Sequence, residues 1–252
     1  FLSTLFGKSY SIVMWVPGYC IKIYREREEK RENDMERVIC LLIGYVFGMF
    51  QTAYFYGKSY GIDIRTKGSG NAGTTNVLRT LGLKAGLITF VCDVLKCLLA
   101  VLVTWLIFRT SHSEIIKSLK IYKSSGVILG HNYPFYLKFK GGKGIAVTAG
   151  MIIAFMCWYL IVIGLICFFV LFLTTHYVSL ASLALSAEFL IGVLVSSQLG
   201  LYHMEQTDLN EMCLIIILLT VMIFCKHRSN IVRLIRGKER KTYLSRKQKS
   251  DL

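Results

Sequence analysis

Three polar segments of the chain combine glycine, hydroxyl, amide and basic residues in patterns that suit phosphate binding. The first, residues 68–79, reads GSGNAGTTNVLR. Small residues let backbone N–H groups approach an anion, the Ser, Thr and Asn side chains add donors, and Arg79 adds a charged planar fork. The segment lacks GxGxxG spacing and a preceding strand, so it is not a dinucleotide-binding loop. It predicts a site for a small anion, with a flexible glycine turn as the alternative.

The second segment, residues 130–144, reads GHNYPFYLKFKGGKG. It is not a Walker A loop, because Leu137 stands where the first glycine belongs and Gly144 replaces Ser or Thr. A glycine turn with two lysines at the start of a helix can still cradle a phosphate. The alternative is that these lysines only orient the chain in a membrane.

The third segment, residues 227–239, reads HRSNIVRLIRGKE. His227 and Asn230 are three positions apart and therefore share one face of a helix. Binding of anionic lipid accounts for the surrounding basic residues, but neither His227 nor Asn230 is needed for it. We therefore expect both side chains to have a role other than lipid binding.

The elements that must position these segments are membrane helices. Of the 252 residues, 54% are hydrophobic and only 18% are charged, whereas a soluble domain carries about 25% charged residues. Apolar runs near the length that spans a bilayer recur along the chain. They cover residues 38–57, 85–108, 121–137, 144–173, 177–197 and 212–225. The composition predicts an all-α, polytopic integral membrane protein and excludes disordered and collagen-like chains.

The distribution of charge predicts the topology. Loop 58–84 and the tail after residue 224 are rich in Lys and Arg, whereas loop 198–211 is acidic, so the first two face the cytoplasm. Five or seven spans satisfy this constraint. We favour about seven short spans, with the run 144–173 crossing twice, because this places more of the basic residues inside. The three polar segments then share the cytoplasmic face.

The remaining composition narrows the class of protein further. The net charge of +15 fits basic loops, phosphorylated ligands and an anionic lipid surface, and no nucleic-acid partner is expected. The eight cysteines show no CxxC pair, so neither a disulfide framework nor a metal site is expected. We divide the chain into an N-terminal extension (1–34), a membrane domain that effectively starts near Met35 (35–240) and a basic cytoplasmic tail (241–252).

The three segments together resemble the bacterial acyl-phosphate:glycerol-3-phosphate acyltransferase family. They match GSGNxGxTNVxR, GHxxPxxxxFKGGKG and HRxNI in the same order, over about residues 35–240. The resemblance implies transfer of a fatty acyl group from acyl phosphate to the 1-hydroxyl of glycerol 3-phosphate in the bacterial plasma membrane. The products are 1-acylglycerol 3-phosphate and phosphate, in the first step of phospholipid synthesis. It implies no cofactor and no metal, and, as partners, membrane lipid and an acyltransferase that produces acyl phosphate.

The resemblance also assigns site residues. Glycerol 3-phosphate, or its reacting hydroxyl, would be held by Ser69, Asn71, Thr75, Asn76 and Arg79. The donor phosphate would be held by Lys140, Gly141, Gly142, Lys143 and Gly144. The reacting centre would be lined by Ser69, His131, His227 and Asn230. The proton of the hydroxyl could pass to a histidine or to the leaving phosphate, and the sequence leaves both open.

Two other readings of the chain remain. A transporter of a phosphorylated solute would use the charged residues inside the apolar runs, which are Asp93, Lys96 and Glu188. Alternatively, Asp93 and Lys96 form an internal ion pair that only orients helices. An acyl-CoA-dependent enzyme would instead use the HxxxxD pattern at His203 and Asp208, which falls in the acidic loop away from the basic segments.

Overall fold

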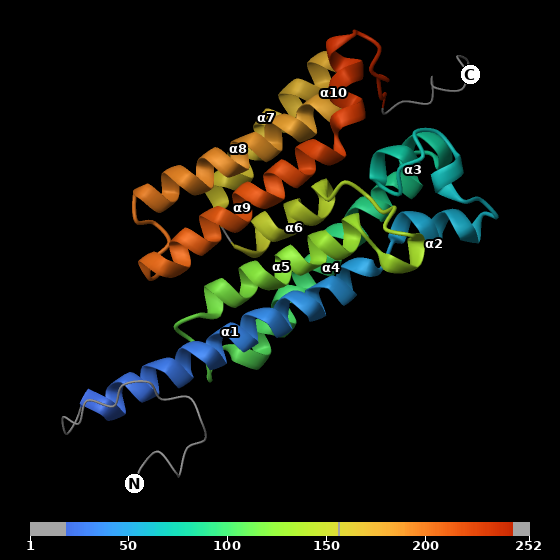
Figure 1. Ribbon diagram of the computed structural model, residues 1–252. Coiled ribbons are helices and arrows are strands. Elements are labelled where there is room, and N and C mark those ends of the chain that lie inside the picture. The colour runs from blue at the N-terminus through green and yellow to red at the C-terminus, as the bar shows by residue number, and fades with distance from the viewer. Residues whose placement is uncertain (1–18, 156, 244–252) are drawn as a thin grey trace.

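The apolar runs fold into helices that lie side by side along one direction (Figure 1). The computed structural model describes residues 19–155 and 157–243, and side chains from residue 34 onward. No strand occurs within these ranges, so the all-α prediction is confirmed for them. The helices are α1 Tyr19–Met49, α2 Thr52–Ser59, α3 Thr74–Leu81, α4 Leu83–Phe108, α5 Ile116–Asn132, α6 Ile145–Ala154, α7 Trp158–Thr175, α8 Val178–Gln198, α9 Gln206–Lys226 and α10 Arg228–Ile235, with short 3-10 turns η2 Ile64–Thr66 and η3 Phe135–Leu137.

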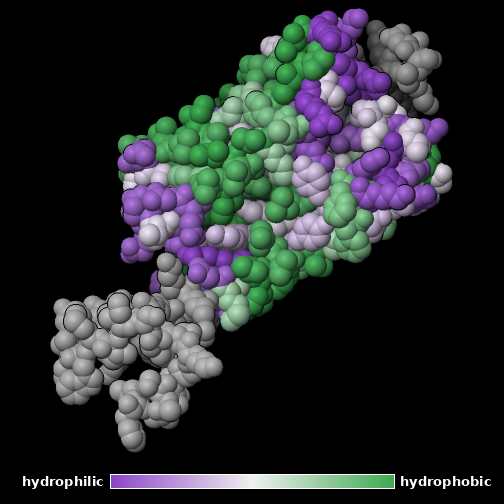
Figure 2. All heavy atoms as spheres, in the orientation of Figure 1, coloured by the Kyte–Doolittle hydropathy of each residue, from purple (hydrophilic) through white to green (hydrophobic). Residues whose placement is uncertain are grey.

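Five segments are long and apolar enough to cross a membrane. They are Asp34–Ser59, Leu83–Phe108, Trp158–Thr175, Val178–Gln198 and Gln206–Lys226. The count of seven is not confirmed. The run 144–173 does divide into two helices, α6 and α7, but the 10 residues of α6 rise only about 15 Å, half of the hydrocarbon thickness. Figure 2 shows a hydrophobic band between two hydrophilic ends, the surface of a multi-pass membrane protein.

The predicted divisions at the two ends of the chain fall largely on residues that the structure does not describe. Residues 1–18 of the expected extension and residues 244–252 of the expected tail lie outside the described residues. From Tyr19 onward, the charged run continues into α1 as one helix of 31 residues. At the other end, Thr242 is fully buried, so the first residues of the predicted tail pack against the membrane domain.

Two pairs of glycines bring α1 and α5 into backbone contact. Gly44 and Gly48 on α1 face Gly126 and Gly130 on α5, four residues apart on each helix. A Cβ atom at any of the four would overlap a backbone carbonyl oxygen of the opposite helix. Such small-xxx-small spacing permits close packing of helices in lipid, where van der Waals contact drives association.

The expected span 38–57 is interrupted between α1 and α2, at Phe50 and Gln51. The Nζ atom of Lys96 donates to the carbonyl oxygen of Phe50 at 2.8 Å and lies 2.8 Å from the Oδ1 atom of Asp93. The side chain of Gln51 donates to the carbonyl oxygen of His131 at 2.9 Å. The predicted pair of Asp93 and Lys96 therefore exists, and it satisfies backbone oxygens that the break leaves without helical partners.

The HxxxxD pattern lies at the end of the molecule opposite α3 and α10, in and beside the turn between α8 and α9 (Figure 1). Asp208 forms an ion pair with Arg37, with 2.6 Å between Nη2 and Oδ1. Arg37 also reaches Glu211 at 3.5 Å. The carboxylate that would orient His203 thus ties α9 to α1 instead.

The glycine contact gives a first prediction. Gly44→Leu should destabilise the protein by about 3 kcal/mol, because the side chain must push α1 and α5 apart. Val46→Leu places the same side chain two residues away, at an exposed position, and should leave stability unchanged. Thermal unfolding of both variants in the same detergent measures the difference. Equal midpoints for the two variants would contradict the role given to Gly44.

Candidate phosphate and acyl-chain site

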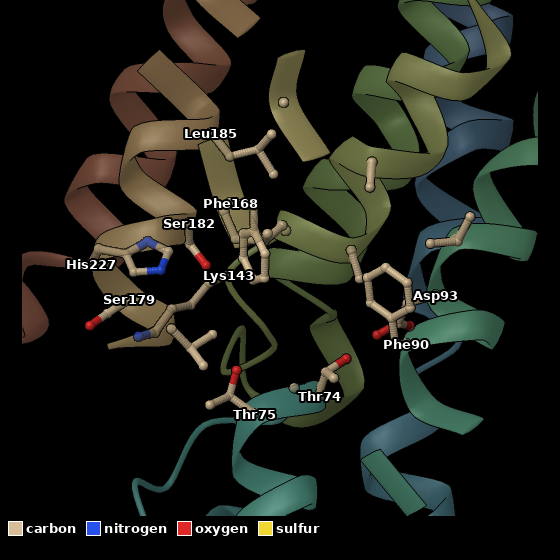
Figure 3. Close-up of a pocket in the computed structure, with 18 of the residues that line it drawn as sticks. Thr74, Thr75, Phe90, Asp93, Lys143, Phe168, Ser179, Ser182, Leu185 and His227 are labelled. Atoms are coloured by element: carbon tan, nitrogen blue, oxygen red, sulfur yellow. The ribbon is translucent and has the colours of Figure 1, made fainter. Parts of the chain in front are cut away.

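A cavity of about 440 Å³ lies where the three polar segments converge. Figure 3 shows Thr74 and Thr75 of α3 facing Lys143, Ser179 and His227 across its polar end. Ten of the residues expected to form a site line this cavity. They are Ser69, Asn71, Thr75, Asn76, Arg79, His131, Lys143, Gly144, His227 and Asn230. The fold therefore gathers segments that are up to 161 residues apart in the sequence, from Ser69 to Asn230.

The loop before α3 is shaped by Asn76, whose side chain is buried beneath it. Its Oδ1 atom accepts from the backbone N–H of Ser69 at 2.8 Å, and its Nδ2 atom donates to the carbonyl oxygens of Ile64 and Lys67 at 2.9 and 3.0 Å. These bonds use most of what an amide can offer. Asn76 therefore positions Ser69, whose exposed hydroxyl has no hydrogen-bond partner among the described residues.

The second segment divides into a residue in the cavity and residues that support it. The ammonium group of Lys143 donates to Oδ1 of Asn230. Burial lowers the pKa of Lys143 to about 8, although the charge of Glu239 opposes the shift. Lys140 is exposed and does not line the cavity. Gly144, with φ +86°, lines the cavity at the start of α6.

Gly141 and Gly142 are buried against His131 and also do not line the cavity. The N–H of Gly142 donates to the carbonyl oxygen of His131 at 3.0 Å, and the N–H of Gly141 donates to that of Asn132 at 3.3 Å. A Cβ atom on Gly142 would overlap the imidazole ring of His131. Glycine is needed here for packing against the histidine, so these two residues support the site from behind.

His131 stands on the cavity wall with one ring nitrogen already engaged. Its Nδ1 atom lies 2.9 Å from Nζ of Lys96 and 3.7 Å from Oδ1 of Asp93. An ammonium group only donates, so Nδ1 accepts this bond and the ring proton of the neutral imidazole is on Nε2. The Asp93–Lys96 pair thereby fixes the ring, and through Gly142 it fixes the loop that carries Lys143.

His227 has the opposite tautomer, with its ring proton on Nδ1. Its Nδ1 atom donates to the carbonyl oxygen of Ile223 at 2.8 Å, which leaves Nε2 as an acceptor. Nε2 has no partner among the described residues. Burial and the nearby charge of Lys143 lower the pKa of His227 to about 4, so the ring is neutral at pH 7. A neutral imidazole with a free Nε2 can accept a hydrogen bond from a hydroxyl group.

Glu239 is a site residue that the sequence did not single out. Its Oε1 atom accepts from Asn230 at 2.7 Å and from Ser179 at 3.0 Å, and its Oε2 atom accepts from Arg233 at 2.7 Å. Burial opposes ionisation, but these hydrogen bonds outweigh it and hold the pKa of Glu239 below its usual value. Its place in the third segment, next to basic residues, was the only available signal.

Arg79 reaches the cavity from α3 and is held by the C-terminal residues. Its Nε and Nη2 atoms donate to Oγ1 of Thr242 at 2.9 and 2.6 Å, and Nη2 also donates to the carbonyl oxygen of Arg240 at 2.8 Å. Burial lowers the pKa of Arg79, which still leaves a guanidinium group charged at neutral pH.

The other part of the cavity is apolar and extends toward the lipid-facing surface. Figure 3 shows Phe90 of α4, Phe168 of α7 and Leu185 of α8 around it. Several lining residues of α4 and α7 are 40–52% exposed, which places them on the hydrophobic band. These are Phe90, Val91, Leu95, Leu165 and Phe169. One cavity thus joins a cationic, donor-rich end to an apolar groove.

Known proteins share this arrangement of segments and helices. Residues 38–237 match the family model described as glycerol-3-phosphate acyltransferase. The chain belongs to this family. It is 36% identical over 212 residues to a glycerol-3-phosphate acyltransferase 2 of Bacillus cereus, covering 84% of this chain and 98% of the relative. It is 37% identical over 209 residues to the glycerol-3-phosphate acyltransferase of Clostridioides difficile, covering 81% and 94%.

Two solved structures of the family match the fold. They are crystal structures of PlsY (YgiH), an integral membrane glycerol 3-phosphate acyltransferase, in its glycerol 3-phosphate form and its lysophosphatidic acid form. Their TM-scores are 0.70 and 0.68, each with 28% identity over 82% of this chain and 96% of theirs. With its apolar helices, the chain is accordingly a multi-pass protein of the bacterial plasma membrane.

The low pKa of Lys143 gives a prediction for anion binding. A bound acyl phosphate dianion favours the ammonium form, so affinity should be nearly level between about pH 7 and 7.5 and fall as the pH rises through about 8. The limiting slope is about tenfold per pH unit, and between pH 7.5 and 9.5 the loss should be about 25-fold. Calorimetric titration with acetyl phosphate, a soluble acyl phosphate, at several pH values measures it, because Lys143 is expected to hold the phosphate of the donor.

Lys143→Arg is the matched control for this titration, because arginine keeps its charge over the whole range. Its affinity should stay level between pH 7.5 and 9.5. The same steep fall in Lys143→Arg would assign the pH dependence to a group other than Lys143.

Proposed function

We propose that the chain transfers a fatty acyl group from acyl phosphate to the 1-hydroxyl of sn-glycerol 3-phosphate, giving 1-acyl-sn-glycerol 3-phosphate and phosphate. The observation that carries this proposal is the single cavity with a cationic end and an apolar groove. Such a cavity suits a donor with an anionic head and a fatty chain beside a small anionic acceptor. Membership of the glycerol-3-phosphate acyltransferase family supports the acceptor.

The polar end offers separate groups for two phosphates. Arg79 and the donors of the first segment, which are Ser69, Asn71 and Thr75, face the cavity from α3 and its preceding loop and hold glycerol 3-phosphate. Lys143 and Gly144 lie at the start of α6, next to the apolar groove, and hold the phosphate of the donor. The fatty chain then lies between α4, α6, α7 and α8.

The reaction forms an ester bond between the 1-oxygen of glycerol 3-phosphate and the acyl carbon, and it breaks the bond from that carbon to the phosphate oxygen. His227 accepts a hydrogen bond from the hydroxyl at Nε2 and orients it for attack. The leaving phosphate takes the proton, because a group with a pKa of about 4 is a weak base at neutral pH. Lys143 stabilises the charge that develops on the leaving phosphate.

An acyl phosphate is a mixed anhydride and is already activated, so the catalytic gain comes from positioning and charge. His131 on the cavity wall and Gly141 and Gly142 behind it support the geometry, and Lys140 adds positive charge at the surface beside the cavity. The basic residues at this end of the molecule favour a position at the cytoplasmic face, where an acyltransferase that makes acyl phosphate would supply the donor.

The choice of donor is tested with purified protein and radiolabelled glycerol 3-phosphate, supplied with either palmitoyl phosphate or palmitoyl-CoA. We expect lysophosphatidic acid only with palmitoyl phosphate. Product only with palmitoyl-CoA, abolished by His203→Ala, would overturn the proposal in favour of the HxxxxD pattern. Absence of product with both donors would support a transporter that uses Asp93, Lys96 and Glu188.

Ser69 allows catalysis to be separated from stability. Its hydroxyl is exposed and lines the cavity. Ser69→Ala should therefore lower kcat/KM by roughly 10- to 100-fold, the range for one hydrogen bond to a charged group, with no change in thermal midpoint. Ser59→Ala removes another exposed serine hydroxyl outside the cavity and should retain full activity. Wild-type rates in Ser69→Ala would remove this hydroxyl from the site.

A further inference from the structure

Residues 238–243, here called the C-terminal strap, run from the end of α10 to the turn between α7 and α8. At one end, Glu239 is bound by Ser179, Asn230 and Arg233. At the other end, the N–H of Thr242 donates to the carbonyl oxygen of His176 at 2.9 Å. The ring of Tyr243 lies 4.7 Å from the ring of His176. The strap is therefore fixed on both sides of Arg240 and Thr242.

Between these two anchors the strap holds one edge of the Arg79 guanidinium. The Oγ1 atom of Thr242 accepts from Nε and Nη2 at 2.9 and 2.6 Å, and the carbonyl oxygen of Arg240 accepts from Nη2 at 2.8 Å. Three of the five N–H donors are thereby used. The two on Nη1 have no partner among the described residues. Arg79 lines the cavity and Thr242 does not.

This arrangement orients a side chain that is otherwise flexible. A free arginine side chain carries about 2 kcal/mol of rotamer entropy, and a guanidinium fixed along one edge loses less of it when the other edge binds an anion. Thr242 is suited to the task because it is fully buried and its backbone is fixed by His176. A hydroxyl oxygen can accept two hydrogen bonds without neutralising the charge that it holds.

We propose that Thr242 is a positioning residue that fixes Arg79 and so sets the affinity for the phosphate of glycerol 3-phosphate. The proposal rests on the proposed function, in which Arg79 binds that phosphate. The match to the family model ends at residue 237, so Thr242 lies beyond the family segment. This positioning role makes the strap part of the site for glycerol 3-phosphate, although no hydroxyl group of the strap contacts the substrate.

The test compares Thr242→Val, which removes the hydroxyl at nearly constant volume, with Thr242→Ser, which keeps it. In Thr242→Val, the KM for glycerol 3-phosphate should rise about tenfold, while kcat and the KM for palmitoyl phosphate stay within about twofold. Thr242→Ser should return the KM to the wild-type value. Thr174→Val, at an exposed position on α7, is the control for a threonine-to-valine change away from the site.

Calorimetric measurement of glycerol 3-phosphate binding without the acyl donor tests the role of Thr242 independently of the proposed acyl-phosphate reaction. Tenfold weaker binding in Thr242→Val supports the positioning role whichever donor the enzyme uses. With Arg79 already changed to Ala, the valine substitution should have no further effect, because its effect passes through that guanidinium. Unchanged binding in Thr242→Val, or an equal further loss in the double variant, overturns the proposal. Thr242→Ala replaces the valine variant if the latter does not fold.

Discussion

The buried carboxylate of Glu239 holds the polar end of the molecule together. Without ligand, Lys143, Arg79 and Arg233 bring positive charge into a partly buried space, where like charges repel strongly. Glu239 offsets this repulsion and joins α8 to α10 through Ser179, Asn230 and Arg233. Its hydrogen bonds keep it ionised despite burial. The charges of Arg79 and Lys143, from the first and second segments, are thus offset by a carboxylate of the third segment, which a phosphate can supplement when it binds.

Much of the fold was predictable because lipid allows few alternatives. A long apolar run must become a helix, and α4 and α8 follow the predicted runs closely, whereas α9 begins six residues before its run. The break at Gln51 was not predictable, because it depends on Lys96 of α4 reaching backbone oxygens of a different helix. The short length of α6 is likewise set by packing. Hydropathy combined with the placement of basic residues therefore gave a count of crossings that the structure does not confirm.

The location of the site was predictable from the sequence, but the role of each residue within it was less so. Charge bias placed three segments on one face, and the cavity does join them. The sequence could not distinguish residues that face the cavity from residues that support it. Asn76 holds the loop backbone, and Gly142 makes room for the ring of His131. Both roles arise from contacts between residues or segments that spacing does not reveal, as does the burial of Glu239.

The apolar groove opens onto the hydrophobic band, and this has a consequence for how lipid substrates and products move in the membrane. Under the proposed function, a fatty chain that enters between α4 and α7 keeps its head at the polar end and its tail among neighbouring lipids. The acyl donor and the acylated product then stay in the same leaflet, and the fatty chain of neither is exposed to water. Turnover is in this sense a sideways exchange of lipids, with only glycerol 3-phosphate and phosphate moving through the aqueous phase.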